Sequence, residues 1–269
     1  MLGLDPDRPA PLKIAALISD LSSEWSGRER AGLKDISLTL EHGEIAAVLG
    51  TAGSGAEELM QLLAGTLRGW TGSALLVGAL FRPDRPLSRR ARRQIAVLGR
   101  EAGLIGRLSV RRNVLAGRAG HLGAGAALWG RFALRDRLAA ELAMEQTGLA
   151  ELADRPARDL PGEARRIALA RCLCQEPRLL VLEQGWAGDA DLLGQERLLR
   201  LVTSIARTRH LALVFRGEAA ALAARYADRL LGMRNGCLVY DGPVDGLGGR
   251  ELDRFFPEMR GAAHLRLVI

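Results

Sequence analysis

Apolar residues along the chain alternate between short runs of strand length and longer segments with helical spacing. Residues 13–21 and 33–40 are predicted strands, and the second alternates apolar and polar positions as a strand with one buried face does. The continuous apolar runs at 45–49 and 178–183 are typical of parallel strands buried on both faces. The N-terminal antiparallel strands are expected to form an edge beside this parallel core.

Helical segments follow several of these strands. Helices are predicted at 56–67, 192–207 and 218–226, further strands at 73–77, 95–98 and 211–215, and a hairpin turn at Asn235-Gly236. Residues 103–150 are mainly helical, interrupted by small residues at 117–130, and no strand pattern occurs before residue 178. The prediction is an α/β fold with a mixed, mainly parallel sheet, an antiparallel edge and a helical subdomain at about 100–175.

Composition places the chain among ordinary globular proteins. It has 269 residues, 48% hydrophobic and 26% charged, and no apolar run of the roughly 18 residues that span a bilayer. Its start lacks the features of a signal peptide, so a cytoplasmic location is expected. Residues 1–12 are proline-rich and predicted to be a loose lead-in. The three cysteines form no metal-binding pattern and are predicted to be small buried hydrophobes.

The net charge of +7 comes mostly from dispersed arginines, which are dense only in the run 82–93. Aromatic residues, on which a single-strand binder would stack bases, are missing from that run. The preferred interpretation is a solvated basic face, and contact with lipid headgroups or an acidic partner is the alternative. Nucleic acid is not an expected partner, although a nucleic-acid-associated protein would explain the charge and predicts a steep salt dependence.

The segment from residue 45 to 60 carries the candidate chemistry. A buried strand leads into a loop with Gly50, Gly53 and Gly55, and a helix begins near Ala56. This order is that of a phosphate-binding P-loop, in which backbone N–H groups and a helix N-terminus converge on an anion. The pattern requires a lysine and a hydroxyl where Ala56 and Glu57 stand.

Six further segments follow one another in an order and spacing that are typical of a single protein family. They are LKDISLTLEHGE, LIGRLSVRRNVLAGR, RRIALARCL after a short LPG, QEPRLLVLE, AARYADRLL and RNGCLVYDG. On these residues the chain resembles the nucleotide-binding subunit of ATP-binding-cassette (ABC) transporters, and is most similar to the ATPase subunit of phosphonate importers, over about residues 13–257. Residues 258–269 are then a C-terminal tail. The resemblance implies ATP and Mg²⁺ as cofactors, a transmembrane permease and a second cassette subunit as partners, and a peripheral place on the inner face of the cell membrane.

The departures from the family's motifs fall on its chemistry. The P-loop positions are Gly50, Gly53, Ser54, Gly55, Ala56 and Glu57. Losing the lysine removes a charged hydrogen bond of about 1.5 to 3 kcal/mol. A carboxylate about 4 Å from a phosphate, at an effective dielectric near 20, repels it by on the order of 4 kcal/mol. Only Lys13 and Lys34 exist in the chain, so no downstream lysine replaces the missing one.

The other motif positions are altered as well. The nucleotide-sensing glutamine aligns with Arg100, which cannot ligate Mg²⁺, and the signature loop becomes Leu160-Pro161-Gly162-Glu163. The metal-binding aspartate aligns with Glu183, which could hold a metal through a water, and the general base with Gln184, whose amide cannot accept a proton near neutral pH.

Two motif positions lie near the ends of the match. The switch histidine aligns with Glu218, and a shift of register to Arg216 or Gly217 brings no histidine either. Trp25 keeps the place where the family stacks an aromatic ring on adenine, with a half-buried surface tryptophan as the alternative interpretation.

The leading hypothesis is a degenerate pseudo-ATPase that binds ATP weakly or not at all and keeps partner docking through the helical segment 104–118. Residues 50–58 would then be a structural turn closed by their own carboxylates. The alternative is an ATP-hydrolysing import subunit in which Arg100, Arg165 or Arg166 replaces the lost phosphate contacts.

Overall fold

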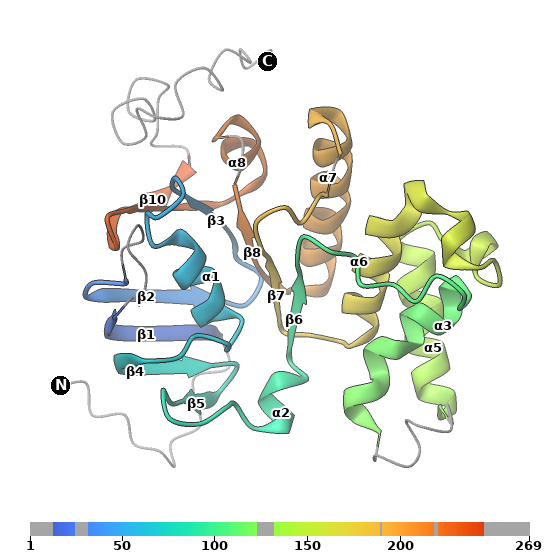
Figure 1. Cartoon of the computed structure of the whole chain (residues 1–269), viewed down its shortest axis with the longest axis horizontal. Coiled ribbons are helices and arrows are strands. Elements are labelled where there is room, and N and C mark those ends of the chain that lie inside the picture. The colour runs from blue at the N-terminus through green and yellow to red at the C-terminus, as the bar shows by residue number, and fades with distance from the viewer. Residues whose placement is uncertain (1–12, 25–31, 123–131, 189, 218–219, 245–269) are drawn as a thin grey trace.

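A six-stranded, mainly parallel sheet runs through the centre of the molecule (Figure 1). The computed structural model describes residues 13–24, 32–122, 132–188, 190–217 and 220–244. In spatial order the strands are β10 (Cys237–Pro243), β9 (Arg229–Arg234), β3 (Ile45–Leu49), β8 (Ala212–Arg216), β7 (Leu179–Leu182) and β6 (Ile95–Leu98). All neighbours pair in parallel except β9 and β10, so the antiparallel edge is the C-terminal hairpin.

The N-terminal strands form a sheet of their own. Its four antiparallel strands are, in spatial order, β2 (Ile36–Glu41), β1 (Ile14–Ser23), β4 (Trp70–Leu76) and β5 (Ala79–Phe81). The expectation that β1 and β2 form the edge of the parallel sheet was therefore wrong. Strand β1 takes β4 as its second partner, and the alternating pattern that predicts a strand does not identify its neighbour.

Two apolar cores lie on the two faces of the six-stranded sheet. Along β3, Ala46 and Val48 pack with the antiparallel sheet and α1 (Ala56–Leu63), whereas Ile45, Ala47 and Leu49 pack with the helices on the opposite face. Because successive side chains of a strand point to opposite faces, a strand covered on both sides must be apolar throughout. All five residues of β3 are buried, as the continuous apolar run predicts.

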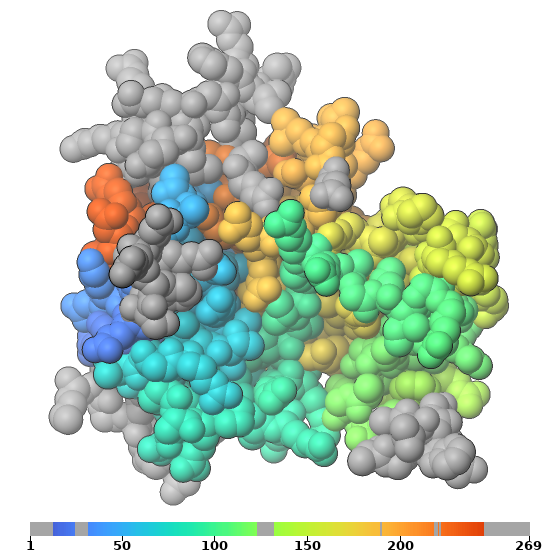
Figure 2. Space-filling model, in the orientation of Figure 1, coloured from blue at the N-terminus to red at the C-terminus, as the bar shows by residue number. Residues whose placement is uncertain are grey.

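The second face carries α6 (Ala164–Cys174), α7 (Leu192–Arg209) and α8 (Ala220–Tyr226). Helices α3 (Val110–Leu115), α5 (Leu134–Gln146) and α6 pack on one another at one side of the molecule, where Figure 2 shows their surface in green to yellow. Short 3-10 helices join them: η1 (Ala116–His121), η2 (Ala150–Leu152), η3 (Ala157–Asp159) and η4 (Pro161–Glu163). Within the described residues, no strand lies between β6 and β7, as predicted. The exact division into domains stays a prediction.

Several element boundaries differ from the expectation by a few residues. Helix α1 ends at Leu63 and not at residue 67, because Gly65 adopts a left-handed backbone (φ 72°) that stops a helix. The short helix α2 (Arg89–Arg92), capped by the Ser88 side chain, was not predicted, since four residues are too few for a periodic pattern. The Asn235-Gly236 turn is confirmed, with both residues in the left-handed region (φ 51° and 83°) that a type I′ hairpin needs.

Two of the three cysteines are buried as expected. Burial raises the pKa of the Cys172 thiol to about 11 and that of Cys174 to about 12, so neither is a reactive thiolate. Cys237 is exposed at the start of β10, where its side chain points away from the sheet's core, so the expectation of burial was wrong for this residue. None of the described helices has the length and apolar character to cross a membrane. Trp25, Glu218 and the two terminal segments 1–12 and 258–269 lie outside the described residues.

Candidate functional site

The loop after β3 is a tightly fastened turn that needs glycine at two positions. Gly53 and Gly55 have φ values of 77° and 94°, which L side chains rarely adopt, and α1 begins directly after Gly55. The Ser54 carbonyl accepts a hydrogen bond from the backbone N–H of Gly236 at 2.9 Å, so the hairpin β9–β10 holds the loop from one side. A Cβ on Gly55 would lie 2.9 Å from the Cα of Gly236, which explains the need for glycine here.

A buried arginine binds the backbone at the start of the same loop. Arg216, the last residue of β8, is only 7% exposed. Its guanidinium donates to the Val48 carbonyl at 2.9 Å and to the carbonyl of Gly50, the first residue of the loop. Its position follows from the register of the sheet, which pairs Val48 of β3 with Arg216 of β8. A protein cation therefore binds the carbonyl groups at the base of the loop, a role that the sequence analysis did not foresee.

A small cavity of about 140 Å³ lies beside the start of α1. Its lining combines carboxylate, amide and guanidinium groups with one thioether: Glu57, Met60, Gln61, Arg100, Glu183, Gln184 and Arg216. Three positions that the sequence analysis assigned to separate motifs, at Arg100, Glu183 and Gln184, thus meet around the residue that replaces the P-loop hydroxyl. Ser54 is buried in the loop, where its hydroxyl oxygen accepts a 3.4 Å hydrogen bond from the Ala56 N–H.

Two carboxylates face each other across this cavity. Glu183 follows β7 directly, and its pKa is raised above the ordinary value, first by burial and second by the negative charge of Glu57. Glu58, the next residue of α1, is 1% exposed and belongs to the core side of the helix. The structure therefore places two carboxylates, in a cavity that Arg100 and Arg216 also line, where the P-loop pattern calls for a lysine and a hydroxyl.

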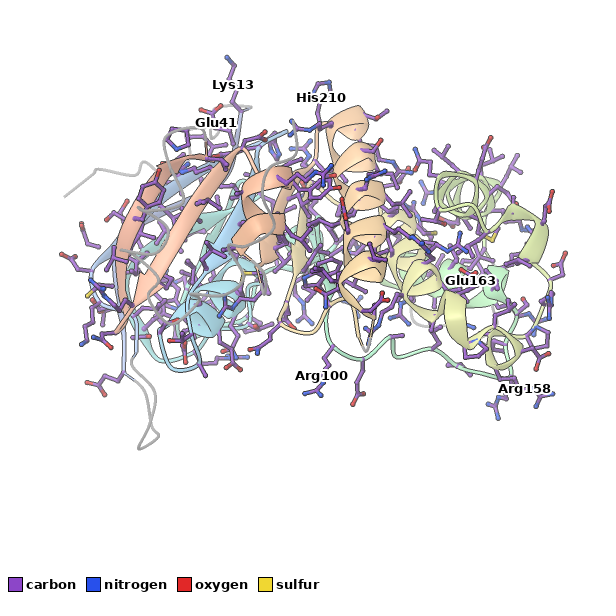
Figure 3. All side chains as sticks on the ribbon, turned by 90° about the horizontal axis from the view of Figure 1, so that it is seen from above. Lys13, Glu41, Arg100, Arg158, Glu163 and His210 are labelled. Atoms are coloured by element: carbon purple, nitrogen blue, oxygen red, sulfur yellow. The ribbon has the colours of Figure 1, made fainter. Side chains whose placement is uncertain are left out.

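Arg100 lines the cavity with its side-chain stem and projects outward from the edge of the molecule (Figure 3). A Cβ added to Gly185 would lie 2.9 Å from the Arg100 Cγ, which shows how closely the stem packs there. Gln184 is exposed at the same opening. Its amide offers no lone pair that accepts a proton near neutral pH, so the cavity holds no general base at this position.

The two other arginines considered as substitutes are engaged elsewhere. Arg165 donates to the carbonyls of Gly99, at 3.0 Å, and of Arg100. Arg166 pairs with Glu163 in the shortened signature loop. Neither belongs to the described lining of the cavity.

The altered signature loop forms the 3-10 turn η4 directly before α6. A Cβ placed on Gly162 would meet no atom within 4 Å, so this residue lies on open surface. Glu163 is the N-cap residue of α6, so this helix N-terminus has a carboxylate from its own chain next to it. Arg166 forms an ion pair with that carboxylate.

The donor groups do not match those by which a P-loop holds a magnesium nucleotide. The described lining of the cavity contains no lysine, and Arg216, which does line it, donates to carbonyl oxygens of the protein. Glu57 presents a carboxylate where the phosphate oxygens and the metal would need a hydroxyl. The described residues contain no group of three or more side chains suited to a metal ion, and Glu183 stands opposite a single further carboxylate.

One feature of the sequence indicates that Arg216 is buried and bonded inside the protein. A charged residue that ends a continuous apolar strand, in the run LALVFR, needs a buried partner once the strand lies inside a parallel sheet. Identifying that partner requires the order of the strands, which places β8 next to β3. A guanidinium from another strand thus holds the base of the loop, and closure of the loop by its own carboxylates stays a prediction.

Comparison with known proteins gives a consistent result. The family described as "ABC transporter" matches residues 33–184. A phosphonates import ATP-binding protein of Rhodopseudomonas palustris is 34% identical over 90% of this chain and 86% of its own length. A phosphonates import ATP-binding protein of Alcaligenes faecalis is 31% identical over 89% of this chain and 87% of its own length.

Solved structures agree on the fold. The cbiO1 protein of Clostridium perfringens, described as part of the ABC transporter complex cbiONQ, superposes with a TM-score of 0.73 at 22% identity, covering 91% of this chain and 95% of that one. A nucleotide-free ATP-binding cassette of an ABC transporter gives a TM-score of 0.71 at 17% identity over 93% of this chain and 98% of that one. The predicted fold class is confirmed.

Arg216→Met is expected to lower the free energy of unfolding by about 1.5 to 3 kcal/mol, the worth of hydrogen bonds from a charged donor. The reason is that the carbonyls of Val48 and Gly50 lose their common donor. Urea denaturation measures the change, and Arg90→Met, at an exposed position of α2, is the matched control. Equal stability of the two variants would contradict the role assigned to Arg216.

Glu57→Gln is expected to lower the pKa of Glu183, because it removes the neighbouring negative charge that helps to raise it. Side-chain carboxyl chemical shifts, followed by NMR from pH 3 to 8, measure this pKa directly. A carboxyl whose pKa is higher in the folded state holds its proton longer than in the unfolded chain. The free energy of unfolding therefore falls as the pH rises from the ordinary carboxyl pKa through the raised one. In the Glu57→Gln variant the free energy of unfolding is expected to fall less steeply over this pH range. In the control Glu41→Gln, on the antiparallel sheet, the fall is expected to match that of the unaltered chain.

Proposed function

Because the chain belongs to the ABC transporter family, we propose that it is a cassette subunit of an importer that docks on a permease and hydrolyses ATP poorly or not at all. Its relatives at about one-third identity are named as phosphonate import proteins, so the complex that it joins is proposed to be of that import type. Its place is the inner face of the cell membrane, in contact with the membrane through the permease.

The observation that carries the proposal is the charge arrangement at the loop. Arg216 satisfies the carbonyls of Val48 and Gly50 from within the protein, so the loop keeps its shape without a bound phosphate. Glu57 and Glu183 add two carboxylates to the adjoining cavity, where a nucleotide would bring further negative charge. At about 4 Å and an effective dielectric near 20, each such pair repels by on the order of 4 kcal/mol. An affinity loss of thousands-fold follows.

The family's dimer geometry extends the argument to any partner subunit. In this family each ATP lies between the P-loop of one cassette and the signature loop of the other. An intact partner would therefore meet the altered loop at residues 50–58 in one site and Pro161-Gly162-Glu163 in the other. In this chain Glu163 is paired with Arg166, so a carboxylate and its counter-ion occupy the signature position. Both composite sites are proposed to be impaired.

Docking on a permease rests on a different part of the chain. The segment 104–118 contains α3, whose start is capped by the Ser109 side chain, which accepts a hydrogen bond from the Arg112 N–H. Asn113, 2% exposed, donates to the carbonyls of Ile105 and Leu108 and accepts from the Ile105 N–H at 2.8 Å. This anchoring gives the segment a fixed surface that does not depend on the nucleotide site.

An ATP-hydrolysing subunit remains the second candidate, and Arg100 is the residue that favours it. It is the one arginine named in that hypothesis that lines the cavity, and its guanidinium lies at the open edge where a bound phosphate could be reached. This candidate requires measurable binding of ATP with Mg²⁺.

The purified chain is expected to turn over ATP more slowly than about 1 s⁻¹, the low end of ordinary enzymes, with or without its permease. Labelled ATP with Mg²⁺ should bind at least a hundredfold more tightly to the double variant A56K/E57S, because this variant restores a cation and removes a carboxylate. Thr51→Lys, which adds the same charge at an exposed loop position, is the control. Fast turnover or micromolar ATP binding by the unaltered chain would refute the proposal.

Docking predicts that the chain, co-expressed with an importer permease from its own genome, co-purifies with that permease from detergent-solubilised membranes. Ala119 directly follows the segment 104–118 and lines a groove of about 550 Å³ between α2, η1 and α6, so Ala119→Trp, which places a bulky ring there, is expected to reduce the recovered complex at least fivefold. Ala150→Trp, on the exposed surface of η2, should leave recovery unchanged. Equal recovery of both variants would contradict docking at this groove.

A further inference from the structure

Strand β6 is the outer edge of the six-stranded sheet, and helix α6 lies beside it (Figure 1). Helices α3, α5 and α6, with the 3-10 helices η1 to η4, form the helical group. An edge strand leaves one side of its backbone without a neighbouring strand, so its carbonyls need other donors. Side chains of α6 and of its C-cap residue Gln175 bond eight such carbonyls, those of Arg92, Arg93, Ile95, Val97, Gly99, Arg100, Ala102 and Gly103.

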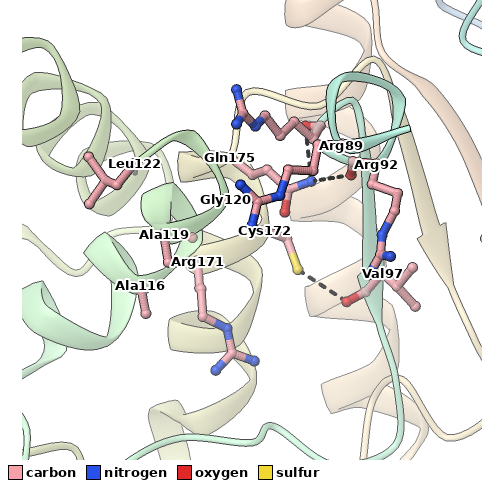
Figure 4. A pocket seen from close by; sticks show the side chains of 12 residues that line it. Arg89, Arg92, Val97, Ala116, Ala119, Gly120, Leu122, Arg171, Cys172 and Gln175 are labelled. Atoms are coloured by element: carbon pink, nitrogen blue, oxygen red, sulfur yellow. Dashed lines mark hydrogen bonds between the residues drawn. The ribbon is translucent and has the colours of Figure 1, made fainter. Parts of the chain in front are cut away.

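The carbonyls of β6 alternate between two partners. That of Leu98 accepts from a backbone N–H just past β7, at 3.0 Å, whereas those of Ile95 and Val97 point the other way. Ile95 accepts from the Gln175 amide at 2.7 Å. Val97 accepts from the Cys172 thiol at 3.4 Å, where Figure 4 draws a dashed line. A shift of α6 by one residue along β6 would place carbonyls already bonded to β7 opposite these donors, so only one register satisfies the edge.

Two arginines of α6 extend these contacts to the loop after β6. Arg165 donates to the Gly99 carbonyl at 3.0 Å and to that of the next residue. Arg171 donates to the carbonyls of Ala102 at 2.6 Å and Gly103 at 2.7 Å. Hydrogen bonds from a charged donor are stronger than neutral ones, and this loop is one of the two chain connections between the sheet and the helical group. The four donor residues form what is termed the carbonyl clamp: Arg165, Arg171, Cys172 and Gln175.

Neighbouring glycines fit closely around the clamp. A Cβ on Gly188, in the loop after β7, would lie 2.4 Å from the Arg165 Nε. A Cβ on Gly117, in η1, would lie 2.2 Å from the Arg171 carbonyl oxygen. The Arg165 guanidinium therefore has backbone directly behind it, and η1 is held against α6 at Arg171.

Further contacts join the helical group internally and tie it to α7. Arg118 of η1, 4% exposed, pairs with the fully buried Asp136 of α5 at 2.9 Å and donates to the Cys174 carbonyl at the end of α6. Breaking a buried ion pair leaves an uncompensated charge, which is strongly destabilising. From the side of the sheet, Arg209 at the end of α7 donates to the Leu173 carbonyl at 3.1 Å. Helix α6 is thus bonded to η1, to α7 and to the edge of the sheet.

We infer that the carbonyl clamp joins the sheet and the helical group into one rigid body, whose two parts keep the same relative orientation with and without MgATP. Turning the group about its two chain connections would separate the donors on α6 from the carbonyls of residues 92–103. The edge of β6 would then lose its hydrogen bonds, and unpaired carbonyls that are shielded from water are costly.

The rigid body follows from these contacts alone, and its consequence for docking rests on the proposed function. The groove has Arg89 and Val97 on the side of the sheet and Ala119 on the side of the helical group (Figure 4). The clamp lies between these walls, so it fixes their separation. A permease would meet a groove that is already shaped before any nucleotide binds.

Distances between two spin labels on the full-length chain test the inference. One label is attached to Cys237, exposed on β10, and the other to a cysteine introduced by Glu151→Cys in the exposed turn η2. Cys172 and Cys174 are buried and stay unlabelled. Double electron–electron resonance is expected to give one narrow distance distribution with the same mean before and after addition of MgATP. The mean should also stay fixed in A56K/E57S, which is designed to bind ATP more tightly.

Two outcomes of this measurement would overturn the inference. One is a distribution with two separated peaks in the unaltered chain. The other is a mean distance that moves when MgATP is added, either to the unaltered chain or to A56K/E57S.

Variants identify the clamp as the cause of the rigidity. R165M/R171M removes the four contacts to residues 99–103, so the distribution should become at least twofold broader. Arg158→Met, at an exposed position of η3, is the matched control and should leave the width unchanged. If R165M/R171M lowers the thermal midpoint measured by circular dichroism, Gln175→Met removes the contacts at the other end of the clamp and should broaden the distribution as well. An unchanged width in both clamp variants would contradict the inference.

Failure of the proposed function is separable, because the distance measurement involves neither ATP turnover nor a permease. A narrow, unmoved distribution in a chain that hydrolyses ATP rapidly would leave the clamp intact and refute only the pseudo-ATPase. A broad distribution in a chain that does not hydrolyse ATP would refute the clamp alone. Recovery of the permease complex with R165M/R171M tests the link to docking, and at least a threefold loss is expected. Full recovery despite a broadened distribution would remove the clamp's role in docking.

Discussion

Parallel pairing of β3 with β8 is the constraint on which the site depends. The carboxyl ends of parallel strands meet at one edge of a sheet, so whatever follows β3, β7 and β8 is brought together there. In this chain those residues are the glycine loop, Glu183 and Arg216. Both faces of the sheet are covered by apolar cores, so a charge at the end of β8 is largely buried. The guanidinium of Arg216 must find oxygen atoms nearby, and the carbonyls at the base of the loop supply them.

This internal bonding changes how the loop relates to ligands. An ordinary P-loop directs its amide hydrogens at a phosphate, and the bound anion compensates them. Here the loop is fastened through its carbonyls, to Arg216 below and to the Gly236 amide at the side. The buried positive charge beside this loop, that of Arg216, is bonded to carbonyl oxygens of the protein. Glu57 and Glu183 bring two carboxylates to the cavity that Arg100 and Arg216 also line.

Elements with strong local patterns were predictable from the sequence, and those defined by distant partners were not. The buried runs of β3 and β7 and the Asn235-Gly236 turn are confirmed because burial on both faces and left-handed turn geometry each demand particular residue types locally. The separate antiparallel sheet was missed because alternation marks a strand and not its neighbour. In the candidate site, the sequence alone reveals that Ala56 and Glu57 stand where the P-loop pattern has a lysine and a hydroxyl. The role of Arg216 was not visible, since it depends on a register between strands 166 residues apart.

The hairpin turn at Gly236 has a consequence for how the chain acquires its shape. Its N–H holds Ser54 and its carbonyl accepts from the Lys34 N–H at 2.9 Å, so one glycine joins the N-terminal strands, the loop and the last strands of the sheet. During synthesis the loop leaves the ribosome long before β8 and the hairpin exist, and it has nothing to hold its backbone in the left-handed region. The site is therefore among the last parts of the molecule to form. A chain that stops before the hairpin would keep every residue of the glycine loop and lack its conformation.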